Sequence, residues 1–77
     1  MEYTYRTHEE VLNSLPESIA TYILQTSKTI DRYKEQGHTE LVRQQKDVGR
    51  GYIIALRDCG FIGNVDMRRL IMRYVQR

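Results

Sequence analysis

The sequence has few of the residues that stabilise many small proteins. It contains one Cys, one Pro, two His and no Trp among 77 residues. One cysteine excludes an intramolecular disulfide, and so few Cys and His residues offer no structural zinc set. No apolar run approaches the roughly 18–20 residues of a membrane-spanning helix. We therefore expect no metal, no cofactor and no membrane partner. The lone cysteine, and an acidic, aromatic start unlike a signal peptide, favour a cytoplasmic protein.

The length and composition indicate one small globular domain over residues 1–77. The chain is 40% hydrophobic and 29% charged, a balance typical of a folded protein. A chain of this length buries only about 60–65% of the surface that its unfolded form exposes. Small domains without disulfides or metals are often stabilised by self-association. We therefore expect a homodimer or a higher homo-oligomer.

A capping box predicts the first helix. The motif Thr7-x-x-Glu10 lies just before two apolar residues, and in such a box each side chain accepts a hydrogen bond from the other residue's backbone N–H. It predicts a short helix over residues 8–13. Residues 1–6 alternate weakly between tyrosine and polar residues. Because no second strand is expected elsewhere, we interpret them as an arm.

A second capping box, Ser14-x-x-Glu17, predicts a long helix directly afterwards. Its expected range is about 15–36, and Gly37 suits the left-handed conformation that ends many helices. Apolar side chains recur on one face of this helix at helical spacing. This face carries Ile19, Tyr22, Ile23, Thr26, Ile30 and Tyr33.

The link at residues 36–38 is short, which predicts that the next helix is an antiparallel neighbour. We expect that helix over about residues 39–60, with Thr39 as its N-cap and Gly60 at its end. Two adjacent apolar stripes follow its length, and we assign both to the core. The first stripe holds Leu41, Val48, Tyr52, Ala55 and Cys59, and the second holds Val42, Gly49, Ile53 and Leu56.

A last helix is expected from residue 65 to about residue 76, with Asn64 as its N-cap. Its core stripe is Met67, Leu70, Ile71 and Tyr74. The complete prediction is an all-α fold. An antiparallel helical hairpin carries a short N-terminal helix, and a C-terminal helix packs on the hairpin.

The tripeptide Gly49-Arg50-Gly51 is unusual for a helix interior, where each glycine costs about 1 kcal/mol relative to alanine. One explanation is a close helix crossing, and a second is a break or kink in the helix. A third is an anion site, in which backbone N–H groups approach a phosphate and Arg50 assists. The tripeptide matches no established phosphate-binding motif.

Several apolar residues lie off the predicted core stripes, which indicates a buried interface between subunits. The central helix places one of them, Ile54, on its polar side. The complete interface set is Leu24, Ile54, Met72 and Val75.

A row of arginines on the last helix is the candidate for nucleic-acid binding. Arg69, Arg73 and Arg77 are spaced four residues apart, and Arg68 lies beside them. A helix-turn-helix does not fit, because neither position of its turn buries a clean apolar pair. Phosphate contacts without base readout, a solvated helix face, and docking of an acidic surface remain as alternatives. The acidic surface includes the chain's own residues 1–27, where one Arg stands against four Glu.

The sequence shows no catalytic constellation. Cys59 precedes a helix C-terminus, where the helix dipole disfavours a thiolate, and we interpret it as a core residue. His8 and His38 would form a metal site only if the fold brought them together.

We therefore predict a non-enzymatic protein that regulates or inhibits a protein partner stoichiometrically. Many phage and mobile-element proteins that block host machinery share this size. The alternative is an anion binder, which contacts nucleic acid through phosphates or holds a nucleotide-type ligand between subunits.

Overall fold

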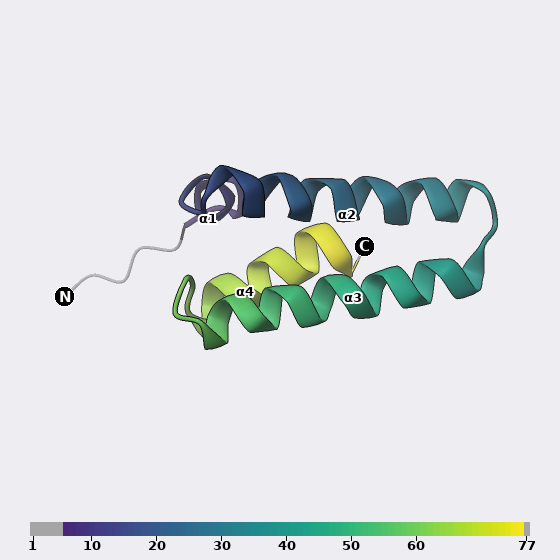
Figure 1. Cartoon of the computed structure of the whole chain (residues 1–77). Helices are drawn as coiled ribbons and strands as arrows, with labels where there is room; N and C mark the ends of the chain where they lie inside the picture. The colour runs from purple at the N-terminus through teal and green to yellow at the C-terminus, as the bar shows by residue number, and fades with distance from the viewer. Residues whose placement is uncertain (1–5, 77) are drawn as a thin grey trace.

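The computed structural model describes residues 6–76 and confirms the all-α fold. Its α-helices are α1 (His8–Asn13), α2 (Glu17–Glu35), α3 (Thr39–Asp58) and α4 (Asn64–Leu70). A π-helical turn, η1 (Ile71–Val75), continues α4, and we call the two together the C-terminal helix. The hairpin of α2 and α3 carries the C-terminal helix against both of its helices (Figure 1). The molecule measures 47 × 20 × 19 Å.

The N-terminal capping box is confirmed, and the second box is wrong. The Thr7 hydroxyl accepts from the Glu10 N–H at 3.1 Å, and Glu10 accepts from the Thr7 N–H at 3.2 Å. Ser14 instead donates its hydroxyl to the Val11 carbonyl at 2.6 Å. Its side chain therefore closes α1, and α2 begins after Pro16 without a side-chain cap. The predicted arm lies outside the described residues, except for Arg6.

Two glycines end the long helices as predicted. Gly37 has φ = 73° and Gly60 has φ = 84°, the left-handed region that glycine enters without strain. In each case the N–H of the following residue bonds to a carbonyl five residues earlier, and this closes the helix end. The predicted N-caps are displaced by one residue. Thr39 and Asn64 are each the first residue of their helix, and neither helix has a side-chain cap.

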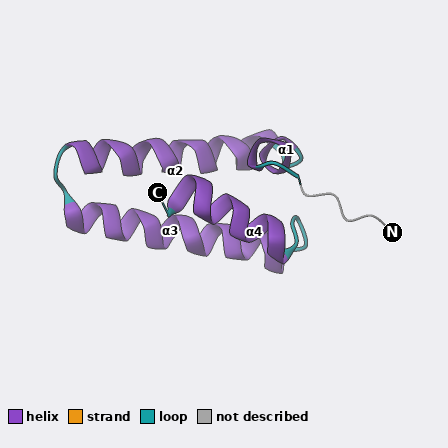
Figure 2. Cartoon of the chain, turned by 180° about the vertical axis from the view of Figure 1, so that it is seen from behind, coloured by secondary structure: helices purple, strands orange, loops and turns teal. Residues whose placement is uncertain are grey.

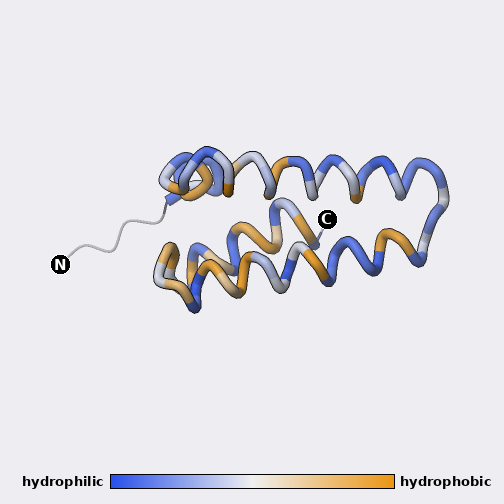
Figure 3. Tube along the Cα trace, in the orientation of Figure 1, coloured by the Kyte–Doolittle hydropathy of each residue, from blue (hydrophilic) through white to orange (hydrophobic). Residues whose placement is uncertain are grey.

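The core lies in the half of the hairpin that the C-terminal helix covers. It consists of Val11, Leu12, Leu15, Ile23, Ile30, Ile53, Leu56, Ile62, Leu70, Tyr74 and Val75. Seen from behind, the C-terminal helix runs beside the hairpin and stops before its turn (Figure 2). Hydrophobic residues gather where α4 meets α3, and hydrophilic ones dominate near the turn (Figure 3). The hairpin therefore has a packed end and a two-helix end.

The first predicted core stripe of α3 is mostly exposed. Leu41 is 38% exposed and Val48 is 51% exposed, while Ala55 and Cys59 also face solvent. The second stripe contains the residues that pack inward, Gly49, Ile53 and Leu56. The interpretation of Cys59 as a core residue is therefore wrong. The spacing identified two apolar stripes, but the C-terminal helix covers the side away from the first one.

Val75 was predicted at an interface between subunits, and this is wrong. It is only 1% exposed and packs in the core of the single chain. The reason is the π turn, in which Gln76 N–H bonds to the Ile71 carbonyl at 2.7 Å. A π turn takes more residues per turn than an α turn. It therefore rotates Val75 toward the hairpin, whereas regular α spacing would have turned it away.

Candidate functional site

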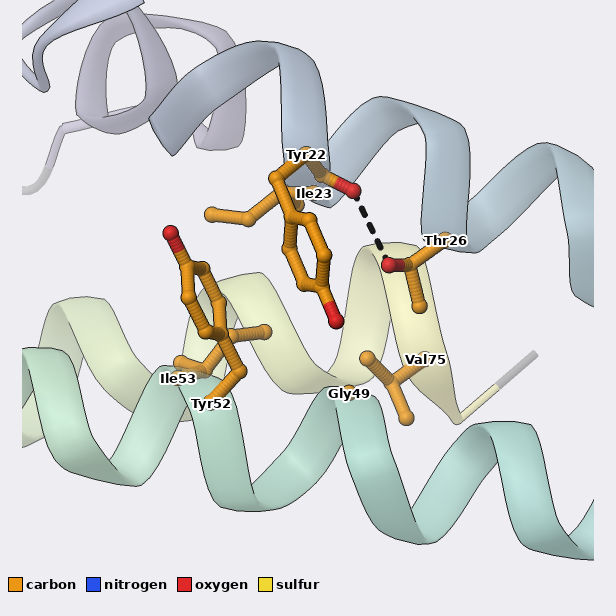
Figure 4. A pocket seen from close by; sticks show the side chains of 7 residues that line it. All are labelled: Tyr22, Ile23, Thr26, Gly49, Tyr52, Ile53 and Val75. Atoms are coloured by element: carbon orange, nitrogen blue, oxygen red, sulfur yellow. Dashed lines mark hydrogen bonds between the residues drawn. The ribbon is translucent and has the colours of Figure 1, made fainter. Parts of the chain in front are cut away.

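Three helices pack closely at Gly49, in agreement with the explanation of the Gly49-Arg50-Gly51 tripeptide as a close helix crossing. A Cβ atom on Gly49 would lie 3.0 Å from Thr26 Cγ2 and 3.0 Å from Val75 Cγ2. Thr26 holds its position because its hydroxyl donates to the Tyr22 carbonyl at 2.9 Å. Figure 4 shows these side chains converging between α2, α3 and the C-terminal helix. The space between them does not admit a water molecule, so it is packed core and no ligand pocket.

The predicted helix break and the anion loop at residues 49–51 are absent. α3 runs without interruption from Thr39 to Asp58. Inside such a helix each N–H bonds to the carbonyl four residues earlier and is not available to a phosphate. Gly51 differs from Gly49, because a Cβ added there would meet no atom within 4 Å.

Arg50 is half-buried and has partners within the chain. Its Nη1 atom lies 3.5 Å from Asp47 Oδ1, one helical turn earlier. Its guanidinium also donates to the Gln76 side-chain oxygen, with Nε at 3.2 Å, when the amide oxygen faces it. It borders a shallow depression of about 260 Å³ together with Arg43 and Lys46. Arg50 therefore links α3 to the end of the C-terminal helix, within a basic surface that Asp47 partly neutralises.

A second shallow depression combines arginines with exposed apolar side chains. Arg69 and Arg73 line it together with Val65 and Met72, and its volume is about 470 Å³. Arg68 is exposed on the same helix, while Arg77 lies outside the described residues. The structure brings Arg69 and Arg73 together as predicted, but Arg50 borders a different depression. The sequence-predicted anion site is thus two separate surfaces.

The remaining interface candidates differ in exposure. Met72 is 71% exposed and Leu24 is 39% exposed, so both are accessible to a partner. Ile54 is half-buried. Val65 and Phe61 were not predicted, yet they are 41% and 50% exposed. Phe61, directly after the helix-ending Gly60, is exposed, whereas the following Ile62 is buried.

Two tyrosine rings pack against each other in a tilted arrangement, on the side of the hairpin away from the C-terminal helix. The rings of Tyr22 and Tyr52 have centroids 4.3 Å apart with planes at 44°. Figure 4 shows the pair bridging α2 and α3, with the C-terminal helix behind.

Tyr74, by contrast, is buried at the packed end, where its ring meets His8 edge-on at 5.8 Å. Burial raises the pKa of the Tyr74 hydroxyl; Arg73 lowers it and Glu9 raises it further by smaller amounts.

An ion pair joins the first described residue, Arg6, to α4, with signs opposite to those that the overall charge distribution suggests. One alternative from the sequence was that the acidic residues 1–27 pair with the basic C-terminal part of the chain. The Arg6 guanidinium instead pairs with the Asp66 carboxylate on α4. In this contact the N-terminal segment supplies the positive charge, and α4 supplies the negative charge. It leaves Arg68 and Arg73 exposed.

No metal centre forms among residues 6–76. Within that range no cluster of three or more His, Cys, Asp or Glu side chains is placed to bind an ion. His8 packs beside Tyr74 and His38 beside Tyr33, at opposite ends of the hairpin.

Among residues 6–76, no helix has the length and apolar character to cross a membrane. Comparisons with protein-family models, curated proteins and solved structures find no match to this chain.

Proposed function

We propose that this protein is a small, non-enzymatic interaction protein that binds a protein partner stoichiometrically and acts as a homo-oligomer. The observation that supports partner binding is the outer surface of the C-terminal helix. There Met72, the most exposed large apolar side chain among residues 6–76, lies among Val65, Arg69 and Arg73. Methionine adapts to irregular surfaces, and arginine is enriched at interfaces. This chemistry fits a partner whose surface combines an apolar patch with carboxylates.

A charge-controlled binding experiment tests this function. The purified chain is used to capture partners from cells that contain it, and native mass spectrometry gives the stoichiometry of the complex. Met72→Asp and Arg73→Glu should each abolish a defined complex that the unchanged chain forms. Lys28→Glu is the control, because Lys28 is an exposed residue of α2 that does not line the depression around Met72. A complex that survives both changes at the C-terminal helix would contradict the proposal.

The two basic depressions support the alternative of an anion binder. Arg43, Lys46 and Arg50 border one, and Arg69 and Arg73 border the other. Nucleic acid would be held through its phosphates, and a nucleotide-type ligand would be held between subunits. Binding of DNA, RNA and ATP measured over a salt series tests it, since each phosphate-binding cation replaced by alanine should reduce the salt dependence by about one unit of slope. Absence of binding at low salt would remove this alternative.

A further inference from the structure

One broad face of the hairpin carries no charged residue. On α2 its side chains are Ser18, Tyr22, Gln25, Thr29 and Tyr33, which recur at spacings of three and four and therefore lie on one side of the helix. None of them is buried. Lys28 and Glu35 lie on other sides of α2, and Arg32 lies at the edge of this face, with its guanidinium carbon 6.0 Å from the centre of the Tyr33 ring.

The same face continues on α3 and its C-terminal cap. It comprises Leu41, Gln44, Val48, Tyr52, Ala55 and Cys59, of which Tyr52 is half-buried and the others are exposed. The stacked rings of Tyr22 and Tyr52 join the two rows, so both lie on one side of the hairpin. We call these eleven residues the neutral face.

The C-terminal helix covers the opposite side. Arg57 Nη1 donates to Asn64 Oδ1 at 3.3 Å, and Arg50 donates to the Gln76 side chain. Arg50 and Arg57 are two helical turns apart and thus point the same way from α3. Charged and polar groups therefore border the covered side, and the neutral face has no helix over it among residues 6–76.

The size and chemistry of the neutral face fit a second copy of this chain. The neutral face extends about 27 Å along α3 (18 residues at 1.5 Å each) across the 20 Å width of the molecule, so each copy contributes about 540 Å², the size of a weak and reversible interface. The chain has a net charge of +2, so two copies repel through their basic surfaces but not through an uncharged one. A face without cations does not attract phosphates, and its Gln and Thr residues are too polar for a lipid interior.

The spacing on α3 also suits pairing with itself. Residues 41, 45, 48, 52, 55 and 59 follow intervals of four, three, four, three and four, the pattern of a helix–helix seam. Five of them belong to the neutral face, and Gln45 is a half-buried neighbour of it. These intervals read the same in both directions. A twofold axis between Val48 and Tyr52 therefore places Val48 opposite the partner's Tyr52. The same axis places Leu41 opposite the partner's Cys59.

We propose that two copies of this chain associate through the neutral face, with the two α3 helices antiparallel. This inference deepens the homo-oligomeric part of the proposed function, on which it rests, by naming the surface and the symmetry. The stacked Tyr22–Tyr52 pair of each copy lies in the contact. The surface around Met72 and Arg73 remains accessible for a different partner.

Matched valine substitutions test the surface. Sedimentation velocity or light scattering should show a dimer at about 100 µM, and Val48→Glu should weaken it by about 100-fold or more, because the change buries two carboxylates near the twofold axis. Val65→Glu makes the same change on the C-terminal helix, where Val65 is 41% exposed, and should leave the dimer intact. Circular dichroism verifies that both variants are folded. A strict monomer at that concentration, or a larger effect of Val65→Glu, overturns the proposal.

A cysteine experiment tests the symmetry. Cys59 is the only cysteine, and in the antiparallel pair the two copies of Cys59 lie about 27 Å apart, from 18 residues at 1.5 Å each. The unchanged chain should therefore give no covalent dimer with a short bis-maleimide, whereas Leu41→Cys should give one. Leu41→Cys combined with Cys59→Ser should give none. Cross-linking of the unchanged chain through Cys59 would indicate parallel helices and overturn the arrangement.

The failures of the two proposals are distinguishable. A monomeric chain that still binds a protein partner through Met72 and Arg73 would overturn the dimer and the homo-oligomeric part of the proposed function, and it would leave partner binding intact. A dimer that forms no complex with another protein would leave the neutral face intact and remove the partner-binding function.

Discussion

The two broad faces of the hairpin are made by the same pair of helices but differ in what covers them. On one face the C-terminal helix packs down, with Val75 against Gly49 and Arg57 bonded to Asn64. On the other, the neutral face, the stacked rings of Tyr22 and Tyr52 bridge the two helices in place of a third helix. The difference teaches that an apolar stripe at helical spacing shows where a helix lacks charge. It does not show which stripe the rest of the chain will cover.

The largest expected contrast comes from one substitution made on both faces. Val75→Ala should lower the free energy of unfolding by about 2 kcal/mol, because it leaves a cavity beside Gly49 in a fully packed region. Val48→Ala should change it by less than about 0.5 kcal/mol, since Val48 is 51% exposed in the single chain. Urea unfolding at low concentration, where any dimer has dissociated, provides the measurement. Equal effects would mean that the two faces are covered alike.

The two glycines of α3 should respond in opposite directions to alanine. Gly49→Ala should destabilise the fold by about 1 kcal/mol, because the new methyl group would push against both Thr26 and Val75. Gly51→Ala meets open space and should stabilise it by up to about 1 kcal/mol through helix propensity. Thermal unfolding of both variants gives the comparison. Stabilisation by Gly49→Ala would show that Thr26 and Val75 can shift to accommodate the new methyl group at little energetic cost.

A double-mutant cycle measures what the neutral face contributes by itself. Tyr22→Leu and Tyr52→Leu, singly and together, should reveal a coupling of about 0.5–1 kcal/mol from the stacked rings. Tyr22→Leu with Tyr33→Leu is the control pair, because the Tyr33 ring contacts His38 instead. The control pair should be additive. A coupling near zero for the first pair would mean that its rings contribute only by covering area.

The smallest expected effect is a pH dependence at the packed end. Burial raises the pKa of Tyr74 in the folded state above its ordinary value of 10.0, so the unfolded chain loses this proton first as pH rises. The contribution of Tyr74 to stability is therefore complete below about pH 10 and declines above it. Unfolding free energies of the unchanged chain and of Tyr74→Phe, compared from pH 8 to pH 11, should diverge only at the alkaline end. Parallel profiles would contradict this assignment.

Local signals in the sequence predicted the fold well. The capping box at Thr7 and the terminating glycines Gly37 and Gly60 depend on interactions between residues a few positions apart. Such interactions can be predicted without knowledge of the tertiary structure. Ser14 failed because its hydroxyl had a second acceptor, the Val11 carbonyl, that closes the preceding helix. The short link before Thr39 was sufficient to predict the antiparallel hairpin.

The surfaces were harder to predict because they depend on packing between distant segments. Val75 and Cys59 exchanged their expected roles once the π turn and the docking side of the C-terminal helix were fixed. The sequence alone shows that each long helix has one side with few charges. Only the pairing of α2 with α3 shows that these two sides lie next to each other and form one face.

The short turn at Gly37 also has a consequence for the order in which the chain folds. It joins helices that are adjacent in sequence, so the α2–α3 hairpin closes at low entropic cost. Packing of Val75 against Thr26 must instead close a much longer segment. The hairpin is thus expected to form first and the C-terminal helix to dock afterwards. Until docking, both broad faces are open, and the asymmetry between them is established in the final step of folding.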